Sequence, residues 1–259
     1  MPALVHELAK PYQEKIFKID AMHKEDLHLD AHGNLQSVTL RAGEHEMELS
    51  AEHFVFTAGE GNEVIVEKLN QPTLAMQRRP LHMTLVTVPA HYALYAHCVS
   101  LGARPRITVT THYMNDGSAV WYLGGLLSET GVDKTPEQQI KAAKKELASL
   151  FPWLDFSASK YATFRIDRAE PKQKSGLKPE TSFCSTYGNV TIGWPTKLAL
   201  APKLAAEIIS QITSPAVIAR SALCDEAIQQ PNSAVSSPEL KTWPHAPLAT
   251  PIWEELLCD

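Results

Sequence analysis

The segment from Phe54 to Ile65, FVFTAGEGNEVI, constrains the fold strongly because it joins an apolar strand pattern to a helix pattern through two glycines. A turn of this kind presents backbone N–H groups and the positive end of a helix dipole to an anion. The full G-x-G-x-x-G dinucleotide fingerprint is absent, because Val64 stands where the third glycine would fall. The expected acidic ribose ligand is replaced by Arg78-Arg79. On the motif alone, a strand ending in a tight turn is favoured.

Alternating apolar residues precede this segment and predict short antiparallel strands. The period is two from Phe17 to Thr57, and turn residues at 30–34 and 42–44 separate the pieces. The alternating pairs are Phe17 and Ile19, Leu27 and Leu29, Val38 and Leu40, and Met47 and Leu49. The sequence therefore predicts a small antiparallel meander, followed at 54–56 by a strand that suits a parallel sheet covered on both faces.

The middle of the chain carries a second set of strand patterns. Four consecutive strands without an intervening helix favour one antiparallel sheet. They are predicted at 81–88, 92–99, 106–112 and 119–123, and two more strands are expected at 161–166 and 189–192.

Two amphipathic helices are predicted in the second half. Thr135 supplies an N-cap, Pro136 the first helical position and Gln138 the third, so a helix is expected over 136–150. A second apolar stripe runs from Leu198 to Ile212. Repeated prolines interrupt residues 214–259 and predict a tail without long elements, with Trp243, Ile252 and Trp253 as docking points.

Composition limits the classes of function. The chain has 259 residues, of which 44% are hydrophobic, and can bury a sizeable core. Its formal net charge of -5, from 24 basic and 29 acidic residues, argues against a nucleic acid or an anionic membrane as the main partner. The first residues lack a signal-peptide pattern and no apolar run has the length of a membrane span, so a cytoplasmic protein is expected.

The spacing of reactive residues gives little support to metal or hydrolytic chemistry. Eleven histidines include no H-E-x-x-H pair, and no G-x-S-x-G elbow is present. The four cysteines are far apart and form no C-x-x-C pair: Cys98, Cys184, Cys224 and Cys258. We therefore expect no metal site, no disulfide framework and no serine hydrolase.

Three stretches carry candidate binding chemistry. Trp121-Tyr122-Leu123-Gly124-Gly125 either lets a flat ring approach the backbone or simply ends a strand at an aromatic core contact. Gly193-Trp194-Pro195-Thr196-Lys197-Leu198 either offers N–H groups to a ligand or is a turn capped by Thr196. Arg165 and Arg168 either clamp a carboxylate or are solvated surface residues.

Taken in order, these pieces resemble the D-amino-acid-oxidase-like family of FAD-dependent oxidoreductases, in its later two thirds. The resemblance extends over roughly residues 2 to 213. It rests on the opening PALVHELA, the meander ending in AEHFVFTAG, the sheet segment WYLGG and the closing strand–turn–helix from Ile192 to Ala205. Each motif is degenerate, and their order is the stronger evidence. In this family the strand before an Ala-Gly turn is a later cofactor contact, which is how the segment at 54–65 is interpreted.

The resemblance implies FAD as cofactor and a small-molecule substrate, an amine or a hydroxy compound, oxidised by hydride transfer to flavin N5. Arg165 or Arg168 would hold an anionic group of the substrate, and His82 could assist; the family's Gly-x-Arg-Pro-like stretch is not matched here, and no catalytic residue is assigned. The implied cofactor-binding residues are Thr57, Ala58, Gly59, Gly193, Trp194, Pro195, Thr196, Lys197 and Leu198.

The fold class implied is α+β or α/β, the remainder of a Rossmann-like FAD-binding domain plus an antiparallel-sheet substrate domain. The expected division is a partial FAD-binding domain at 1–75 and a substrate-binding sheet with its helix at 76–182. A strand and helix returning to the FAD domain follow at 183–213, and a proline-rich tail occupies 214–259.

The family's first βαβ unit should lie upstream of residue 54, but no earlier glycine-rich turn is present. The chain is expected to be a fragment that works with a separate N-terminal FAD-binding segment, or a truncated relative that does not bind FAD alone. A non-catalytic homologue or interaction subunit is the alternative function. A ligand-binding α+β protein unrelated to flavins also remains open, because each motif alone is weak.

Overall fold

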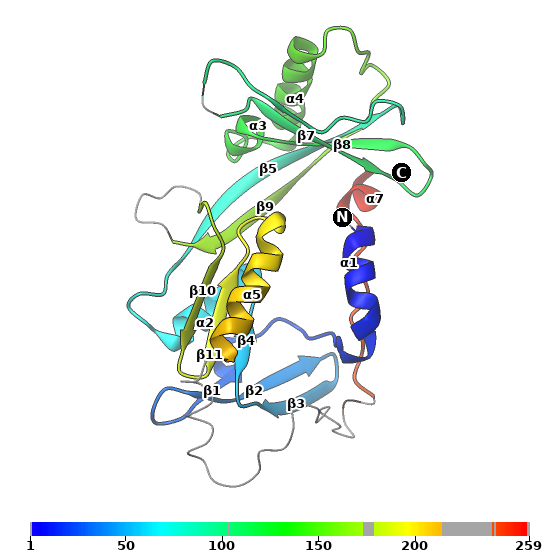
Figure 1. Cartoon of the computed structure of the whole chain (residues 1–259). Helices are drawn as coiled ribbons and strands as arrows, with labels where there is room; N and C mark the ends of the chain where they lie inside the picture. Colours follow the sequence, from blue (N-terminus) through cyan, green and yellow to red (C-terminus); the bar gives the residue numbers. More distant parts are fainter. Residues whose placement is uncertain (1, 103, 173–178, 214–239, 241, 258–259) are drawn as a thin grey trace. The chain divides into compact units, whose positions relative to one another are not determined.

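The computed structural model describes residues 2–102, 104–172, 179–213, 240 and 242–257. The chain forms two compact units, and each of them is assembled from separate stretches of sequence. The first unit consists of Met1–Arg78 and Ala169–Pro247, and the second of Arg79–Arg168 and Leu248–Asp259 (Figure 1). The division falls inside the two long strands β5 (Met76–Val88) and β9 (Tyr161–Pro171).

The first unit contains two three-stranded sheets. An antiparallel meander has the order β1-β2-β3, and a mixed sheet has the order β10-β11-β4, in which β11 pairs antiparallel with β10 and parallel with β4. The strands are β1 (Leu27–Leu29), β2 (Leu35–Ala42), β3 (His45–Ser50), β4 (Phe54–Phe56), β10 (Phe183–Tyr187) and β11 (Val190–Trp194).

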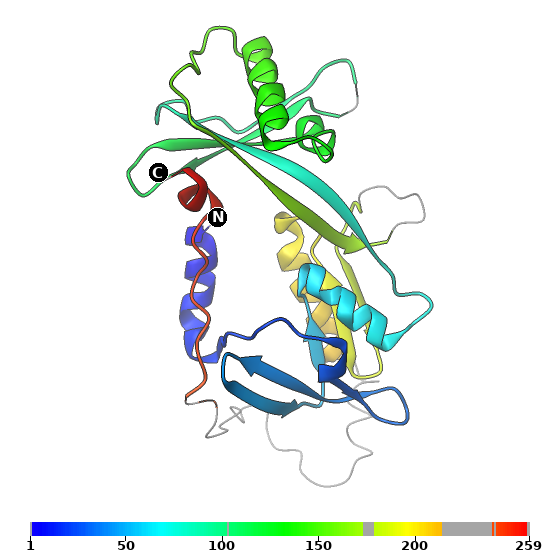
Figure 2. The ribbon, with the colours of Figure 1, turned by 180° about the vertical axis from the view of Figure 1, so that it is seen from behind.

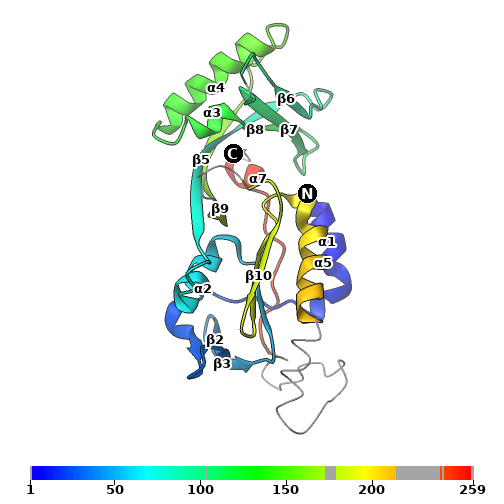
Figure 3. The same cartoon turned by 60° about the vertical axis from the view of Figure 1, so that its left-hand side comes forward.

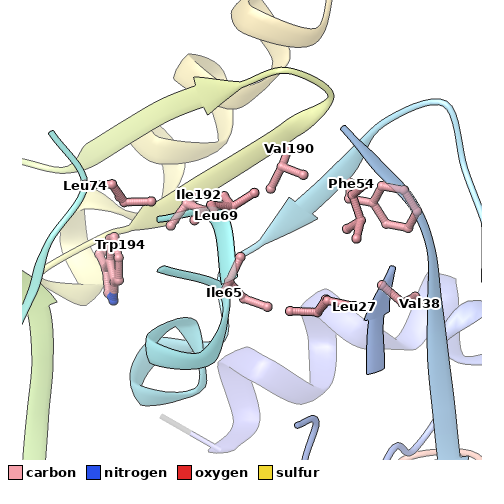
Figure 4. Close-up of a cluster of buried hydrophobic side chains, with 10 residues drawn as sticks. Leu27, Val38, Phe54, Ile65, Leu69, Leu74, Val190, Ile192 and Trp194 are labelled. Carbon is pink, nitrogen blue, oxygen red and sulfur yellow. The ribbon is translucent and has the colours of Figure 1, made fainter. Parts of the chain in front are cut away.

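Short helices accompany these sheets. Helix α2 packs its apolar side on the same face of the mixed sheet as Phe54 and Ile192, and α5 lies along β10 and β11 (Figures 1 and 4). The helices are α1 (Pro2–Ala9), α2 (Asn62–Leu69) and α5 (Ala201–Ile212), with 3-10 turns η1 (Lys10–Lys15), η2 (Lys24–Asp26), η3 (Gly59–Gly61) and η4 (Leu198–Leu200).

One apolar cluster joins the meander, the mixed sheet and α2. Its side chains are almost fully removed from solvent, which is the main favourable term for folding this unit. They come from β1, β2, β4, α2 and β11 and from the loop after α2, and most of them are labelled in Figure 4: Leu27, Leu35, Val38, Phe54, Ile65, Leu69, Leu74, Val190, Ile192 and Trp194.

The second unit is one five-stranded sheet with the order β6-β7-β8-β5-β9. Helices α3 and α4 cover one face over Val86 and Trp121, and α7 packs on the other face over Leu85 and Val120 (Figures 2 and 3). The elements not yet given are β6 (Ala96–Cys98), β7 (Ile107–Tyr113), β8 (Ala119–Gly124), α3 (Leu126–Glu129), α4 (Pro136–Leu150) and α7 (Ile252–Leu257).

The predicted mixed fold with antiparallel sheets is confirmed, and the helix over 136–150 is found with its capping box between Thr135 and Gln138. Both tail tryptophans that the structure describes are buried: Trp243 donates its indole N–H to the Lys18 carbonyl, and Trp253 lies in α7. Residues 214–239 of the predicted tail lie outside the described residues.

Four local predictions are wrong. Phe17 forms an isolated bridge with His245 instead of a strand, because the meander pairs only 27–50. The strand expected at 92–99 is confined to β6. The Thr111 hydroxyl accepts a hydrogen bond from the Leu94 N–H and donates one to the Leu94 carbonyl, so Leu94 bonds to this side chain and not to a neighbouring strand. The helix expected from Leu198 begins at Ala201, after a 3-10 turn. Strand β4 is not covered on both faces, because Val55 is 41% exposed.

Candidate functional site

Two turns of the first unit leave the carboxyl ends of neighbouring parallel strands. Strand β4 and strand β11 pair with Phe56 opposite Ile192, so the turn at 57–59 and the segment at 193–198 leave the same edge of the sheet. In sheets with parallel strands, ligands bind outside the carboxyl ends of the strands. The structure therefore brings together the two sets of residues expected at the cofactor, Thr57 to Gly59 and Gly193 to Leu198.

Asn62 ties these two turns together. Its side chain is fully buried, its Nδ2 donates to the Gly193 carbonyl at 3.2 Å, and its Oδ1 accepts from the Ala58 N–H at 3.0 Å. One amide thus fixes the end of β11 against the start of α2. Sequence reasoning missed Asn62, since an asparagine in the first turn of a helix is an ordinary surface or capping residue.

Gly193 and Trp194 serve packing in this structure. A Cβ on Gly193 would stand 2.9 Å from Leu204 Cδ1, so α5 packs closely on β11 at this glycine. Trp194, whose ring lies in the cluster of Figure 4, is 2% exposed. Its indole N–H donates to the Gly59 carbonyl at 3.0 Å. Gly193 and Trp194 therefore pack against α5 and the turn at 57–59 and are buried, whereas Thr57 and Ala58 are exposed to solvent.

Gly59 is the point where a flat or charged group can approach closely. Its φ is +62°, a backbone conformation that residues with a side chain rarely adopt. A Cβ built there meets nothing within 4 Å, so the space beside this backbone is open as far as the described residues go. The glycine is therefore required by conformation and leaves room for a ligand.

The segment from Pro195 to Leu198 holds a strained turn instead of a simple helix cap. Thr196 has φ +57°, and its hydroxyl donates to the Thr181 carbonyl, so the alternative in which Thr196 caps the helix does not hold. The Lys197 N–H is taken by the Pro195 carbonyl. Among the described residues, the N–H groups of Thr196 and Leu198 have no hydrogen-bond partner. Lys197 and Leu198 are exposed.

The sheet of the second unit presents a row of rings on the face that carries α7. The ring of Tyr122 lies edge-on to those of His112 and Phe164, with centroids 6.0 and 5.7 Å away, and His112 stacks on Trp253 at 4.2 Å. Burial raises the pKa of the Tyr122 hydroxyl, and the positive charge of Arg168 opposes that rise.

Arg168 and Arg165 differ sharply in their contacts. Arg165 donates to the backbone carbonyls of Val132 and Lys134, and so holds the loop before α4. Arg168 is exposed and, among the described residues, its side chain forms no ion pair or hydrogen bond. Because successive residues of a strand point to opposite faces, Arg168 shares the face of Phe164 and Arg165 does not.

His82 lies on the side of the same sheet that α3 and α4 cover, and the paired glycines end strand β8. His82 is 1% exposed, and its Nδ1 bonds to the Gly131 carbonyl at 2.9 Å. Gln139 of α4 donates to the His82 carbonyl. At Gly124 a Cβ would stand 2.6 Å from Thr108 Oγ1, and at Gly125, 2.9 Å from the Pro105 carbonyl. The segment WYLGG therefore ends its strand in close backbone packing.

The described ranges contain neither a metal-binding cluster nor a membrane-spanning helix. No group of three or more His, Cys, Asp or Glu side chains in that part of the chain is placed to hold a metal ion. No helix there has both the length and the apolar character needed to cross a bilayer.

The chain is similar to FAD-dependent oxidoreductases. It is 43% identical over 208 residues to a probable FAD-dependent oxidoreductase of Pseudomonas aeruginosa, an alignment that covers 80% of this chain and 49% of that protein. The crystal structure of an FAD-dependent oxidoreductase from Pseudomonas aeruginosa matches with a TM-score of 0.76 and 36% identity, over 98% of this chain and 64% of that chain. No protein family model matches.

A further solved structure, L-proline dehydrogenase from P. horikoshii, matches with a TM-score of 0.45 and 10% identity over 76% of this chain and 49% of that chain, a likeness too low to carry an argument. The chain spans about half the length of the curated relative it matches. The predicted relation to FAD-dependent oxidoreductases is confirmed at this level, and the narrower D-amino-acid-oxidase-like relation stays a prediction.

Proposed function

We propose that the chain is part of an FAD-dependent oxidoreductase of the D-amino-acid-oxidase-like kind, which oxidises an amine or a hydroxy compound. The observation that carries this proposal is the meeting of two turns at the carboxyl ends of β4 and β11, joined by the buried amide of Asn62. The 43% identity to a probable FAD-dependent oxidoreductase supports it independently and favours an enzyme over a non-catalytic subunit.

The residues at these turns fit a flavin. Gly59 leaves its backbone open to a flat group, and the N–H groups of Thr196 and Leu198 are donors for the carbonyl oxygens of a ring. The exposed ammonium group of Lys197 adds a positive charge beside them. When bound, the flavin would supply an N5 atom that accepts a hydride. The remaining expected contacts, Thr57, Ala58 and Pro195, line the same two turns.

The substrate would be positioned by Arg168. Its guanidinium has no carboxylate partner among the described residues and acts on the neighbouring Tyr122, so it can hold an anionic group of a small molecule beside an aromatic ring. Orientation of this kind lowers the barrier by fixing the reacting carbon. Of the two candidate arginines we favour Arg168, because Arg165 already bonds two loop carbonyls. The contacts of His82 support a structural role.

In this proposal residues 1–75 and 183–213 belong to the FAD-binding part, and residues 76–182 bind the substrate. A further FAD-binding segment outside these 259 residues would complete the cofactor site, because the relative is about twice as long as the aligned region. A nucleic acid is not among the proposed partners.

The experiment is a visible absorbance spectrum after incubation with FAD and removal of the unbound excess. It is recorded for the chain alone and for the chain mixed with the half of the Pseudomonas aeruginosa relative that it does not match, expressed as a separate polypeptide. We expect flavin bands in the mixed sample that neither part retains alone. An Arg168→Ala variant should keep these bands and weaken bleaching by an anionic substrate, whereas Arg165→Ala should lower stability.

Bands in the chain alone would also support the proposal and would make the second polypeptide unnecessary. If the two parts form a complex that stays colourless, the chain is a non-catalytic homologue and the flavin proposal is wrong.

A further inference from the structure

The five-stranded sheet of the second unit ends in strand β6, which has a hydrogen-bonded neighbour on only one side within the described residues. The sheet order β6-β7-β8-β5-β9 places β6 at one edge and β9 at the other (Figure 3). An edge strand presents a row of unpaired N–H and C=O groups, and such a row is a template for pairing with another chain.

The two edges of this sheet are protected to different degrees. Strand β9 carries the exposed charged side chains of Arg165, Asp167 and Arg168, and charged side chains are a usual means of blocking an edge. Around β6 the sequence offers no such protection, because no Lys, Arg, Asp or Glu stands between Arg79 and Arg104. The β6 edge is therefore the one that is suited to pairing.

Large apolar side chains are exposed beside β6. Tyr95 is 68% exposed, Val99 is 65% exposed, and Leu101 is fully exposed. The Tyr95 hydroxyl donates to the Thr111 carbonyl at 3.1 Å, so this ring is already held in place and loses little conformational freedom when a partner covers it. Exposed apolar groups that gather at one place on a surface mark an interaction site.

The hydrogen bonds of β6 show which backbone groups face the open side. Leu94 bonds to the Thr111 side chain through both its N–H and its C=O, and the Cys98 carbonyl accepts from the Arg106 N–H at 2.8 Å. Residues 94 and 98 therefore face β7. Because successive residues of an antiparallel strand direct these groups to opposite sides, residues 95, 97 and 99 direct theirs to the open edge.

We propose that the β6 edge is an interface between two copies of this chain, which pair antiparallel about a two-fold axis and join their two sheets into one. The outward N–H and C=O groups of Tyr95, His97 and Val99 bond to the same set of groups in the second copy. Tyr95 and Val99 lie on one face of the sheet, where they pack against their counterparts as aromatic and β-branched cross-strand pairs.

A second copy fits this edge better than an unrelated strand does. The pairs β6 with β7, β7 with β8 and β8 with β5 are all antiparallel, and a two-fold axis lays two copies of one edge strand antiparallel as well. The outward groups recur at every second residue, so the same strand in reverse presents matching donors and acceptors. The net charge of -5 on each copy is largely screened beyond about 8 Å at about 0.15 M salt.

The test is the molar mass of the 259-residue chain, measured by sedimentation velocity at increasing protein concentration and without flavin. The edge is shorter than a standard interface, which buries about 800 Å² on each partner, so we expect a reversible dimer with a Kd of about 10⁻⁵–10⁻⁴ M. Amide hydrogen exchange then locates the contact. The N–H groups of Tyr95, His97 and Val99 should become protected as the dimer forms. The Leu94 N–H, which is already bonded within the chain, should not change.

A pair of variants at the centre of the edge tests the backbone pairing. His97→Pro removes an outward N–H and leaves the bonds to β7 in place, because proline is tolerated where the N–H of an edge strand faces solvent. His97→Thr keeps the N–H. Since the two-fold axis repeats each substitution, we expect His97→Pro to weaken the dimer at least about tenfold and His97→Thr to leave the Kd within about threefold.

A second pair of variants guards against misfolding of His97→Pro. Val99→Lys places a charged side chain on the edge, which is how natural sheets prevent such pairing, and should also weaken the dimer at least about tenfold. Ala148→Lys adds the same charge at an exposed position of α4 and should leave the Kd unchanged.

A chain that stays monomeric at every concentration would overturn the proposal. So would a dimer whose Kd is the same in His97→Pro and Val99→Lys as in their controls, or one that protects the amides of β9 in place of those of β6. The measurement needs no flavin, so its outcome is independent of the proposed function.

Discussion

At the residue scale, the buried side chain of Asn62 connects two separate parts of the first unit. Its amide satisfies the Ala58 N–H and the Gly193 carbonyl, groups that come from turns more than a hundred positions apart in the sequence. A buried polar side chain is costly unless it is fully hydrogen-bonded, so its position is narrowly determined. The same two bonds set the separation of the turns proposed to hold the cofactor.

Replacement of Asn62 by alanine should therefore affect both stability and the site. We expect Asn62→Ala to lower the free energy of unfolding by about 1–3 kcal/mol, because the buried Gly193 carbonyl loses its partner. Urea denaturation measures the loss. In the flavin experiment, the variant should retain less FAD than the parent chain under conditions where both are folded.

Asn189 provides a matched control at the opposite end of β11. Its side chain bonds to the N–H and the C=O of Leu35, both at 2.8 Å, and so ties the strand to the meander in the way that Asn62 ties it to α2. Asn189→Ala should cost similar stability without reducing FAD retention. Equal loss of flavin in both variants would show that Asn62 acts only through stability.

At the element scale, α7 is held on the second unit by an unusual contact. Trp253 stacks on His112 of β7, with ring centroids 4.2 Å apart and planes 23° apart, and the Asn115 N–H donates to Glu254. Burial disfavours the charged imidazole and lowers the pKa of His112. The folded protein therefore binds a proton at this imidazole less readily than the unfolded chain does.

The sign of the pH dependence follows from this difference. Below about pH 6.5, the usual pKa of histidine, the unfolded chain binds the proton that folded His112 resists, so stability is lost as the pH falls. We expect the free energy of unfolding to decrease between pH 7 and pH 5, and to decrease less in His112→Gln. Thermal unfolding followed by tryptophan fluorescence at several pH values measures both slopes.

His97→Gln is the matched control for this pH series. It makes the same substitution in the adjoining strand β6, at an exposed position of the same sheet. Its slope should equal that of the parent chain. A His112→Gln slope no smaller than this would mean that His53, whose pKa is also lowered by burial, carries the effect.

At the scale of the whole molecule, the sequence predicts the elements better than their partners. Alternation and capping place the helix at 136–150 and most of the strands. Strand β10 was missed because nothing local distinguishes Phe183–Tyr187 until β11 pairs with it. The predicted strand at 161–166 also stopped short of Arg168, so the alternation that separates Arg168 from Arg165 could not be used.

The candidate site follows the same division. The order of motifs was enough to predict the turns at 57–59 and 193–198, which the structure brings to one edge of a sheet. Asn62 could not be found, because its burial depends on a carbonyl 131 positions away. Contacts that depend on long-range pairing are decided by the assembled sheet, and local propensity does not encode them.

The charge of the whole chain makes a prediction that is independent of the site. A net charge of -5 repels a polyphosphate, and many of the guanidinium groups are occupied by carboxylates. The paired arginines are Arg41 with Asp26 and Glu46, Arg78 with Glu60 and Glu63, Arg104 with Glu129, and Arg106 with Glu146. Nucleic-acid binding requires basic groups that replace condensed counterions along the backbone.

We therefore expect no change in the fluorescence anisotropy of labelled single- or double-stranded oligonucleotides when the chain is added at about 0.15 M salt. Lowering the salt should not reveal binding, since the net repulsion grows as screening weakens. A complex whose affinity falls steeply with salt would contradict this, because that slope counts phosphates neutralised by lysine and arginine. Such a result would show that a basic surface exists although these arginines are paired with carboxylates. Nucleic acid would then be a second partner of the chain, in addition to the flavin.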